Sequence, residues 1–281
     1  MLSSIDHVVI AVADLVAATR DYTSLLGCEP SWEGAHPGMG TRNTLFRLPN
    51  TYVELLAADG NGTLGAMVRD ALGGRDERPF ALALGVSEID VTVPALRAAG
   101  FAVMDPMDGS GRDERSGTVR SWRSAFIDTG ATRGLRLFVI QHTSSPDLLP
   151  LARSTAEPST VAAGVDHVVI FTQDLEGSHM MWQRLGVAEI WRQEFPQRGT
   201  RNLGLDLGGI TIELIMRVDR APTDKPDTLW GIAYKVGDCA RSVQRARAGA
   251  IAIDDPRPGL APGTMVSTVR WTRTATLLVE R

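Results

Sequence analysis

The sequence predicts an α+β protein in which four βαβββ units form two similar halves. The first observation is an internal repeat, because residues 5–15 (IDHVVIAVADL) and residues 165–175 (VDHVVIFTQDL) are identical at seven of eleven positions. The second is that the repeat continues, since the tetrapeptide GTRN at 40–43 returns at 199–202. The third is the regular succession of alternating apolar segments and capped helical segments along both halves.

The repeat retains a histidine and a glutamate. His7 and His167 are 160 residues apart (167 − 7), and Glu54 in YVEL and Glu213 in TIEL are 159 apart (213 − 54), so one residue is lost between them. Imidazole and carboxylate are suited to holding a metal ion or moving a proton. Their retention inside apolar strands is the main indication of function.

Units one and three have the same predicted order of elements. In unit one an apolar strand leads into Asp14 as a helix N-cap, an amphipathic helix and Gly27 as its C-cap. The expected elements of unit one are a strand at 5–12, a helix from 14 to 27 and strands at 42–48 and 51–57. Those of unit three are a strand at 165–172, a helix at 174–185 and strands at 188–194, 200–207 and 210–216.

Units two and four repeat this order with less sequence similarity. The expected elements of unit two are a strand at 80–85, a helix at 93–99 and strands at 101–104, 118–127 and 135–141. Those of unit four are a strand at 231–236, a helix at 239–248 and strands at 250–253, 264–271 and 274–280. The segment 143–163 is rich in Ser, Pro, Thr and Ala. We therefore expect an N-terminal domain at 1–145, a linker at 146–162 and a C-terminal domain at 163–281.

Alternation along the strands predicts which side chains share a face. In the first strand the aliphatic face should pack on the helix, which leaves His7 on the opposite, concave face. The same alternation places Glu54 with His7, and Glu213 with His167. Two units joined through their sheets should form a bowl with helices outside and a concave face open to a ligand.

Composition excludes several classes of protein. The net charge of −4 and the absence of a basic stripe argue against a nucleic-acid partner. The sequence has no segment typical of a secretory signal or a membrane span, and Cys28 and Cys239 do not occupy equivalent positions. We expect a cytoplasmic protein without a membrane partner. No Walker or Rossmann glycine loop is present, so no nucleotide cofactor is expected.

The repeated units with His in the first strand and Glu in the fourth resemble the vicinal oxygen chelate superfamily. This group includes glyoxalase I, extradiol dioxygenases, fosfomycin-resistance enzymes and bleomycin-binding proteins. The stretch HPGMGTRN at 36–43, followed by YVEL at 52–55, is similar to the glyoxalase-like branch. The resemblance implies two glyoxalase-like domains with concave mixed sheets.

The resemblance also implies a divalent metal, such as Zn, Ni, Co, Mn or Fe, held by first-strand and fourth-strand residues of paired units. The matching positions are His7, Glu54, His167 and Glu213, with Glu54 and Glu213 as proton-transfer bases. Units two and four have Ala81, Ala233 or close neighbours at the first-strand position, and Phe138 and Leu278 at the fourth-strand position. If unit one pairs with two, each bowl has one His and one Glu. If units one and three pair, the four residues form a complete N2O2 set.

Other residues are candidates for substrate binding, each with a structural alternative. Arg42 and Arg201 would bind an anionic substrate or form salt bridges, including salt bridges to the two glutamates. Asn43 and Asn202 would hydrogen-bond a ligand or satisfy a bend. His36 would lie over a bowl or remain a solvated loop residue. Trp122 and Trp271, in corresponding strands, would line pockets or belong to the core.

Three functional classes follow. A metal-dependent lyase or isomerase, acting on a small molecule with vicinal oxygens, is the preferred hypothesis. A metal-free binding or resistance protein for an antibiotic or metabolite is the first alternative. A ring-cleaving dioxygenase is the second, and it would require a third ligand for an Fe(II) site. The expected partner is a small molecule, and homodimer formation is left open.

Overall fold

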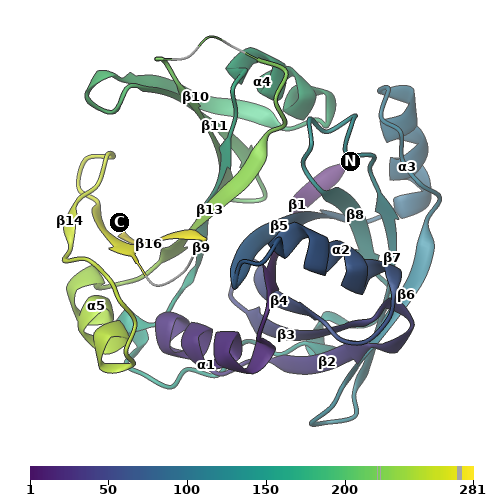
Figure 1. The fold of residues 1–281 in the computed structure, drawn as a ribbon, viewed down its shortest axis with the longest axis horizontal. Helices are drawn as coiled ribbons and strands as arrows, with labels where there is room; N and C mark the ends of the chain where they lie inside the picture. Colours follow the sequence, from purple (N-terminus) through teal and green to yellow (C-terminus); the bar gives the residue numbers. More distant parts are fainter. Residues whose placement is uncertain (220, 222, 271–273) are drawn as a thin grey trace.

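The N-terminal half of the computed structural model is a closed eight-stranded barrel with the strand order β1-β4-β3-β2-β6-β7-β8-β5 (Figure 1). The structure describes residues 1–219, 221, 223–270 and 274–281. The strands of the barrel are β1 (Leu2–Val12), β2 (Trp32–His36), β3 (Thr41–Arg47), β4 (Tyr52–Ala58), β5 (Glu77–Val86), β6 (Met107–Asp113), β7 (Val119–Phe126) and β8 (Leu137–His142).

The C-terminal half forms an eight-stranded sheet that remains open, with the order β10-β11-β12-β9-β13-β16-β15-β14. Its strands are β9 (Gly164–Phe171), β10 (Ala188–Phe195), β11 (Thr200–Leu207), β12 (Ile210–Arg217), β13 (Thr228–Lys235), β14 (Arg257–Pro258), β15 (Met265–Val269) and β16 (Ala275–Glu280). The chain is thus an α+β protein with two sheet-dominated domains in tandem, as the sequence predicts.

The strand pairing decides which units share a bowl. β1 pairs with β5 in antiparallel orientation, and β9 pairs in the same way with β13. Unit one therefore joins unit two, and unit three joins unit four. The complete N2O2 set does not form, because its two His-Glu pairs lie in separate sheets.

Within the described residues, five α-helices accompany the strands, and four match predicted helices. Asp14 caps the first of them by accepting a hydrogen bond from the Ala17 amide, and Gly27 ends it with a φ of 73°, as predicted. The helices are α1 (Leu15–Leu26), α2 (Thr63–Leu72), α3 (Ile89–Ala98), α4 (Leu175–Arg184) and α5 (Cys239–Ala248). Among the residues that the structure describes, no helix combines the length and the apolar character needed to cross a membrane.

Helix α2 was missed by the sequence analysis, and it changes the N-terminal bowl. Leu64, Val68, Ala71 and Leu72 recur at helical spacing, which is the signal that was overlooked. These side chains pack against the apolar cluster on the inner face of the barrel, the face that also carries His7. Figure 1 shows α2 within the ring of N-terminal strands. The described residues between β12 and β13 contain no corresponding helix.

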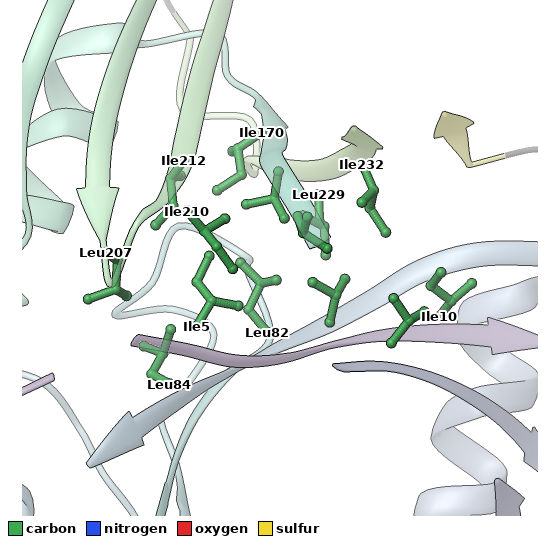
Figure 2. Packing of buried hydrophobic residues seen from close by; sticks show 14 of the residues in the cluster. Ile5, Ile10, Leu82, Leu84, Ile170, Leu207, Ile210, Ile212, Leu229 and Ile232 are labelled. Atoms are coloured by element: carbon green, nitrogen blue, oxygen red, sulfur yellow. The ribbon is translucent and has the colours of Figure 1, made fainter. Parts of the chain in front are cut away.

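The outer faces of the two sheets pack against each other. Figure 2 shows Ile5, Ile10, Leu82 and Leu84 of the barrel beside aliphatic residues of the C-terminal sheet, among them Ile170, Ile212 and Ile232. Burial of each such side chain contributes roughly 1.5–3 kcal/mol. The aliphatic face of the first strand therefore packs on the other half as well as on a helix.

A hydrogen-bonded clamp joins the two halves. The Asn50 side chain donates to the Val165 carbonyl at 2.8 Å and accepts from the Val165 amide at 3.0 Å. The guanidinium of Arg245 on α5 donates to the carbonyl oxygens of Ser24 and Leu25 at the end of α1. These contacts fix the junction beside the start of β9.

The predicted strands at 101–104 and 250–253 are wrong. Only isolated bridges form there, between Val103 and Ile127 and between Ile253 and Val269. Alternating apolar residues gave these segments a strand pattern, but the hydrogen-bonded strands begin later, in β6 and β14. β6 (MDGSGRD) was not recognised because Gly and Asp have low strand propensity. The short strand β2 was missed too.

Candidate functional site

A β-bulge in β1 brings consecutive polar side chains together. The register between β1 and β5 shifts between Ile5 and His7, which leaves Asp6 at the irregularity. The imidazole of His7 therefore donates from Nδ1 to Asp6 Oδ1 at 2.7 Å. Asp6 was not a predicted site residue, although the repeated Asp-His dipeptide in the sequence was a signal for it.

The other imidazole nitrogen faces the fourth strand. β1 and β4 are parallel, with His7 opposite Tyr52 and Val9 opposite Glu54. His7 Nε2 lies 3.4 Å from Glu54 Oε2, and the Asn43 amide donates to Glu54 Oε1 at 2.7 Å. The prediction that His7 and Glu54 share the concave face is therefore confirmed by their contact. Asp6, His7, Asn43 and Glu54 are called the N-terminal tetrad below.

The second half repeats this arrangement. His167 Nδ1 donates to Asp166 Oδ1 at 2.8 Å, and His167 Nε2 lies 3.6 Å from Glu213 Oε2. The Asn202 amide donates to Glu213 Oε1 at 2.7 Å. These four residues form the C-terminal tetrad, so the duplication preserved a hydrogen-bonded group as well as a His-Glu pair.

The outer partner of the aspartate differs between the two tetrads. Asp6 is also in contact with His142 of β8, at 3.0 Å from Nε2 to Oδ2. Asp166 instead accepts from Arg281, at 2.6 and 2.7 Å. A guanidinium thus occupies the place that an imidazole has beside the N-terminal tetrad.

Burial and hydrogen bonding set the charges of the N-terminal tetrad. His7 is 4% exposed and Glu54 is 9% exposed. Burial alone would lower the pKa of His7, but its hydrogen bonds to Asp6 and Glu54 outweigh this and raise its pKa to about 9. Burial opposes ionisation of Glu54, yet the His7 contact lowers its pKa, and the pKa of Asp6 falls further below its usual range. A protonated imidazole therefore lies between two carboxylates.

Aromatic and apolar groups surround the N-terminal tetrad. Tyr52 stacks on the His7 ring at 4.4 Å between centroids, and Phe138 approaches it edge-on at 5.6 Å. The residue of β5 opposite His7 is Ala83, a close neighbour of Ala81, which lies opposite Val9. Unit two thus supplies carbon atoms where a metal-binding unit would supply donors.

The C-terminal bowl has the same gap in its donor set. Ala233 lies opposite His167, as predicted. Leu278 was expected on the concave face, but it is fully buried in the core cluster on the outer side of the sheet. Alternation places Leu277 and Val279 on the concave face instead, and both are apolar.

The fit of each tetrad to a divalent metal is incomplete. Each offers one imidazole Nε2 and one carboxylate Oε2, with an aspartate on Nδ1 as in carboxylate-histidine-metal arrangements. Protein sites for catalytic metals usually have three protein ligands or more. Within the described residues, no group of three His, Cys, Asp or Glu side chains has an arrangement that could hold a metal ion.

Arg42 and Arg201 do not hold the glutamates. Each arginine directly precedes the asparagine that binds the glutamate. Successive side chains of a strand point to opposite faces, so the arginine lies on the face away from the glutamate. Arg42 donates to Glu114 and Arg201 to Glu194, at 2.5 Å in both cases. Both arginines therefore form salt bridges, but their partners are Glu114 and Glu194 and not the tetrad glutamates.

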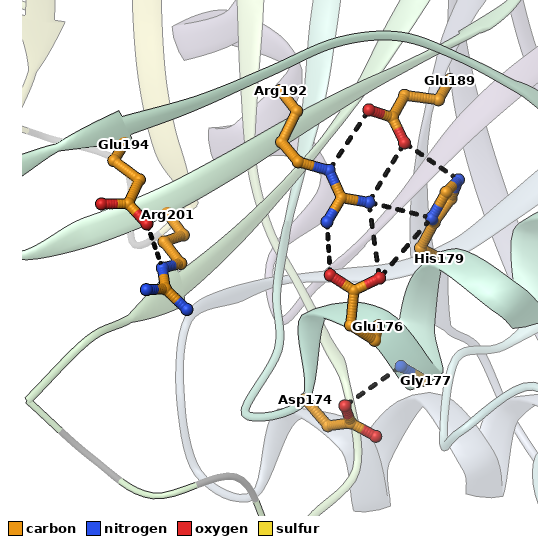
Figure 3. Close-up of polar contacts among 8 residues, drawn as sticks. All are labelled: Asp174, Glu176, Gly177, His179, Glu189, Arg192, Glu194 and Arg201. Carbon is orange, nitrogen blue, oxygen red and sulfur yellow. Dashed lines mark hydrogen bonds and ion pairs between the residues drawn. The ribbon is translucent and has the colours of Figure 1, made fainter.

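A pocket of about 440 Å³ lies beside α4, β10 and β11, and Arg201 contributes to its wall. Figure 3 shows that the charges of its arginines are already compensated. Arg192 contacts Glu176 and Glu189 and approaches His179, while Arg201 contacts Glu194. This pocket therefore offers no free charge for a ligand.

Of the other predicted substrate-binding residues, the structure describes His36 and Trp122. His36 contacts Thr41 Oγ1 at 3.0 Å, and its ring lies 6.2 Å from that of Trp122. Trp122 shares a face of β7 with Phe126, which contacts Phe138 inside the barrel. Trp271 lies outside the residues that the structure describes.

Comparison with known families supports this architecture. Residues 5–163 match the glyoxalase-like domain, and residues 166–267 match the glyoxalase/bleomycin resistance protein/dioxygenase superfamily. The chain therefore belongs to this superfamily, the vicinal oxygen chelate group that the sequence resembles, and it contains two glyoxalase-like domains in tandem.

Individual relatives are more distant. An ethylmalonyl-CoA/methylmalonyl-CoA epimerase of Cereibacter sphaeroides is 37% identical over 76 residues, which cover 26% of this chain and 57% of that enzyme. A variant of 4-hydroxymandelate synthase from Streptomyces coelicolor has a TM-score of 0.69 at 15% identity, with 100% of this chain and 92% of that chain covered. A hypothetical protein from Staphylococcus aureus has a TM-score of 0.67 at 12% identity, covering 100% and 99%. The two structures share the fold alone.

The charges of the N-terminal tetrad predict a pH-dependent stability. Because folding raises the pKa of His7 from 6.5 to about 9, its stabilisation is complete below about pH 6.5 and disappears as the pH rises through about 9. The lowered pKa values of Asp6 and Glu54 add stabilisation that is lost as the pH falls below their unfolded values. We expect the difference in unfolding free energy between wild type and Asp6→Asn/His7→Gln/Glu54→Gln to shrink by on the order of 1–3 kcal/mol between pH 6.5 and 9.5.

Urea unfolding at a series of pH values measures this difference. Val16→Ala, at a residue that is 81% exposed, is the control whose difference from wild type should not depend on pH. A difference for the triple variant that stays constant from pH 6 to 9.5 would show that folding does not raise the pKa of His7.

Proposed function

We propose that the protein binds a small organic molecule in the N-terminal barrel and transfers a proton on it, as an isomerase or lyase. The observation that carries this proposal is the buried N-terminal tetrad, in which His7 Nε2 lies 3.4 Å from Glu54 and the two hold each other in the charged form, since the pKa of His7 is raised and that of Glu54 is lowered. A neighbouring acid and base whose pKa values are pushed apart are the usual requirement for proton transfer at neutral pH.

The roles follow from the hydrogen bonds. Glu54 has one oxygen held by Asn43 and the other facing His7, so its carboxylate is fixed in direction. It would accept a proton from a carbon next to a carbonyl group of the ligand. Protonated His7, oriented by Asp6, would stabilise the negative charge that then develops on the carbonyl oxygen.

Two features favour the N-terminal bowl over its duplicate. Its barrel is closed and α2 covers part of the inner face, which limits the access of water to the tetrad. In the C-terminal tetrad the histidine side chain is 15% exposed, against 5% in the N-terminal tetrad. We assign Glu54 as the reactive base, and Glu213 serves as its matched comparison.

The alternatives differ in what they require. A metal-free binding protein would hold the same ligand without exchanging its proton. A ring-cleaving dioxygenase would require two histidines and one carboxylate around Fe(II). Among the described residues no two histidines and one carboxylate are grouped so that they could hold a metal ion together, so we do not propose this activity.

Proton transfer by Glu54 would exchange a carbon-bound proton of the ligand with solvent. We expect wild-type protein to accelerate hydrogen-deuterium exchange at the carbon between or beside carbonyl groups in a panel of acids and thioesters, followed by NMR. Methylmalonyl-CoA is the first compound of the panel, because the relative that is 37% identical over 76 residues is named as an ethylmalonyl-CoA/methylmalonyl-CoA epimerase. Glu54→Gln should reduce the rate by about 10²–10⁴-fold, because it removes the general base and keeps its shape.

Glu213→Gln is the control, since it makes the same change in the duplicated tetrad. It should leave the exchange rate within about twofold, on the order of 0.4 kcal/mol in the barrier. Loss of exchange in Glu213→Gln with retention in Glu54→Gln would move the activity to the C-terminal bowl and contradict the assignment.

A bound divalent metal is the second candidate, favoured by the gaps of 3.4 and 3.6 Å between imidazole Nε2 and carboxylate Oε2 in the two tetrads. His7 and Glu54, or His167 and Glu213, would hold it with ligand or water oxygens completing the shell. Bound Zn, Ni, Co, Mn or Fe would supply Lewis acidity toward two adjacent oxygens.

Metal analysis of unchelated protein tests this candidate. If a metal is held by the tetrads, His7→Ala or His167→Ala should lower both the metal content and the rise in melting temperature on metal addition, because only the folded state binds it. Absence of stoichiometric metal, together with a melting temperature unmoved by Zn, Ni, Co, Mn or Fe(II), would contradict it. The proton-transfer proposal would be unaffected.

A further inference from the structure

Arg120 on β7 lies inside the N-terminal barrel without an acidic partner. The residue is only 7% exposed. Its guanidinium carbon lies over the rings of Trp32 and Tyr52, at 5.6 and 5.8 Å from their centroids. Within the part of the chain that the structure describes, the Arg120 guanidinium forms neither an ion pair nor a hydrogen bond. It therefore differs from Arg42, Arg192 and Arg201, whose charges are compensated.

A buried cation without a counter-charge costs free energy. The two aromatic faces offset part of this cost, but an aromatic face accepts none of the directional hydrogen bonds that a guanidinium can donate. A group that satisfies both the charge and the donors is an anion with two oxygens, such as a carboxylate or a phosphate.

Glycines make room for the aromatic side chains around Arg120. A Cβ atom at Gly34 would lie 2.4 Å from Trp32 Nε1, and one at Gly109 would lie 2.4 Å from Trp122 Nε1. At Gly111, which lies opposite Arg120 in the sheet, a Cβ atom would meet Trp122 at 3.3 Å. The two indoles thus lie against the wall of the barrel, where larger residues would push them inward.

Arg120 is also close to the N-terminal tetrad. Tyr52 contacts the guanidinium and stacks on the His7 ring at 4.4 Å, so Arg120 and His7 are within the length of one small molecule. In the same tetrad, Asn43 Oδ1 is buried and has no hydrogen-bond partner. A ligand with its anionic group on Arg120 would therefore place its opposite end near Glu54.

We propose that Arg120, framed by Trp32 and Tyr52, binds the carboxylate or phosphate group of a small anionic ligand inside the N-terminal barrel. This inference rests on the proposed function, because it specifies the substrate class of the same bowl. Neither Arg42 nor Arg201 has this role, because each is paired with an exposed acid.

Calorimetric titration of the whole chain with three probes tests this site. The probes are benzoate, inorganic phosphate and benzamide, which is neutral and similar in shape to benzoate. We expect at least one anion to bind and benzamide not to bind. Binding of benzoate alone identifies a carboxylate ligand, and binding of phosphate alone identifies a phosphate ligand. Arg120→Gln should weaken the anion by about 10- to 100-fold, because a charge-assisted hydrogen-bonded pair is lost.

Arg42→Gln is the matched control, since it removes an arginine charge from the neighbouring surface, and it should leave the affinity unchanged. Arg120→Gln should fold, because it removes an uncompensated buried charge. Should it fail to fold, Arg120→Met, which keeps the apolar stem, replaces it with the same expected loss. The proposal is overturned if no anion binds to wild type, or if the folded Arg120 variant binds as tightly as wild type.

Glu54→Gln separates this proposal from the proposed function. It should slow proton exchange by about 10²–10⁴-fold and leave anion binding intact. Anion binding that depends on Arg120, without any proton exchange, would support the anion site and contradict the enzyme. Exchange that depends on Glu54, without anion binding, would support the enzyme and contradict the anion site.

Discussion

The contact between His7 and its two carboxylate neighbours constrains the whole N-terminal barrel. A carboxylate in an apolar interior is stable only when a cation or several donors compensate it. Here the imidazole of His7 takes that role for both Asp6 and Glu54, and Asn43 satisfies one more oxygen. The bulge in β1, the parallel pairing of β1 with β4 and the register of β3 are all required to bring these groups together.

The duplication produced two copies of this group in different surroundings. The N-terminal copy lies in a closed barrel with α2 packed on its inner face, while the C-terminal copy lies on an open sheet. Arg281 on Asp166 replaces the imidazole of His142 on Asp6. The same four residue types are thus more enclosed in one half than in the other.

Much of this arrangement was accessible from the sequence. The period-2 rule placed His7 with Glu54 and His167 with Glu213 because strand alternation depends only on local backbone geometry. The same rule did not find Asp6, because a bulge breaks alternation at that residue. Strand pairing between units could not be predicted, since it depends on contacts between segments distant in the chain. Arg120 was missed because an arginine is informative only once its lack of a partner is known.

The proton on His7 is the central claim, since the proposed acid, the ionised base and the stability of the barrel all depend on it. The most direct measurement is nitrogen-15 NMR of the histidine side chains in the whole chain, with His7→Gln used to assign the His7 signals. Both ring nitrogens of His7 should have the chemical shifts of a protonated imidazole at pH 7.5 and should lose them only near pH 9. Signals of a neutral imidazole at pH 7.5 would contradict this account.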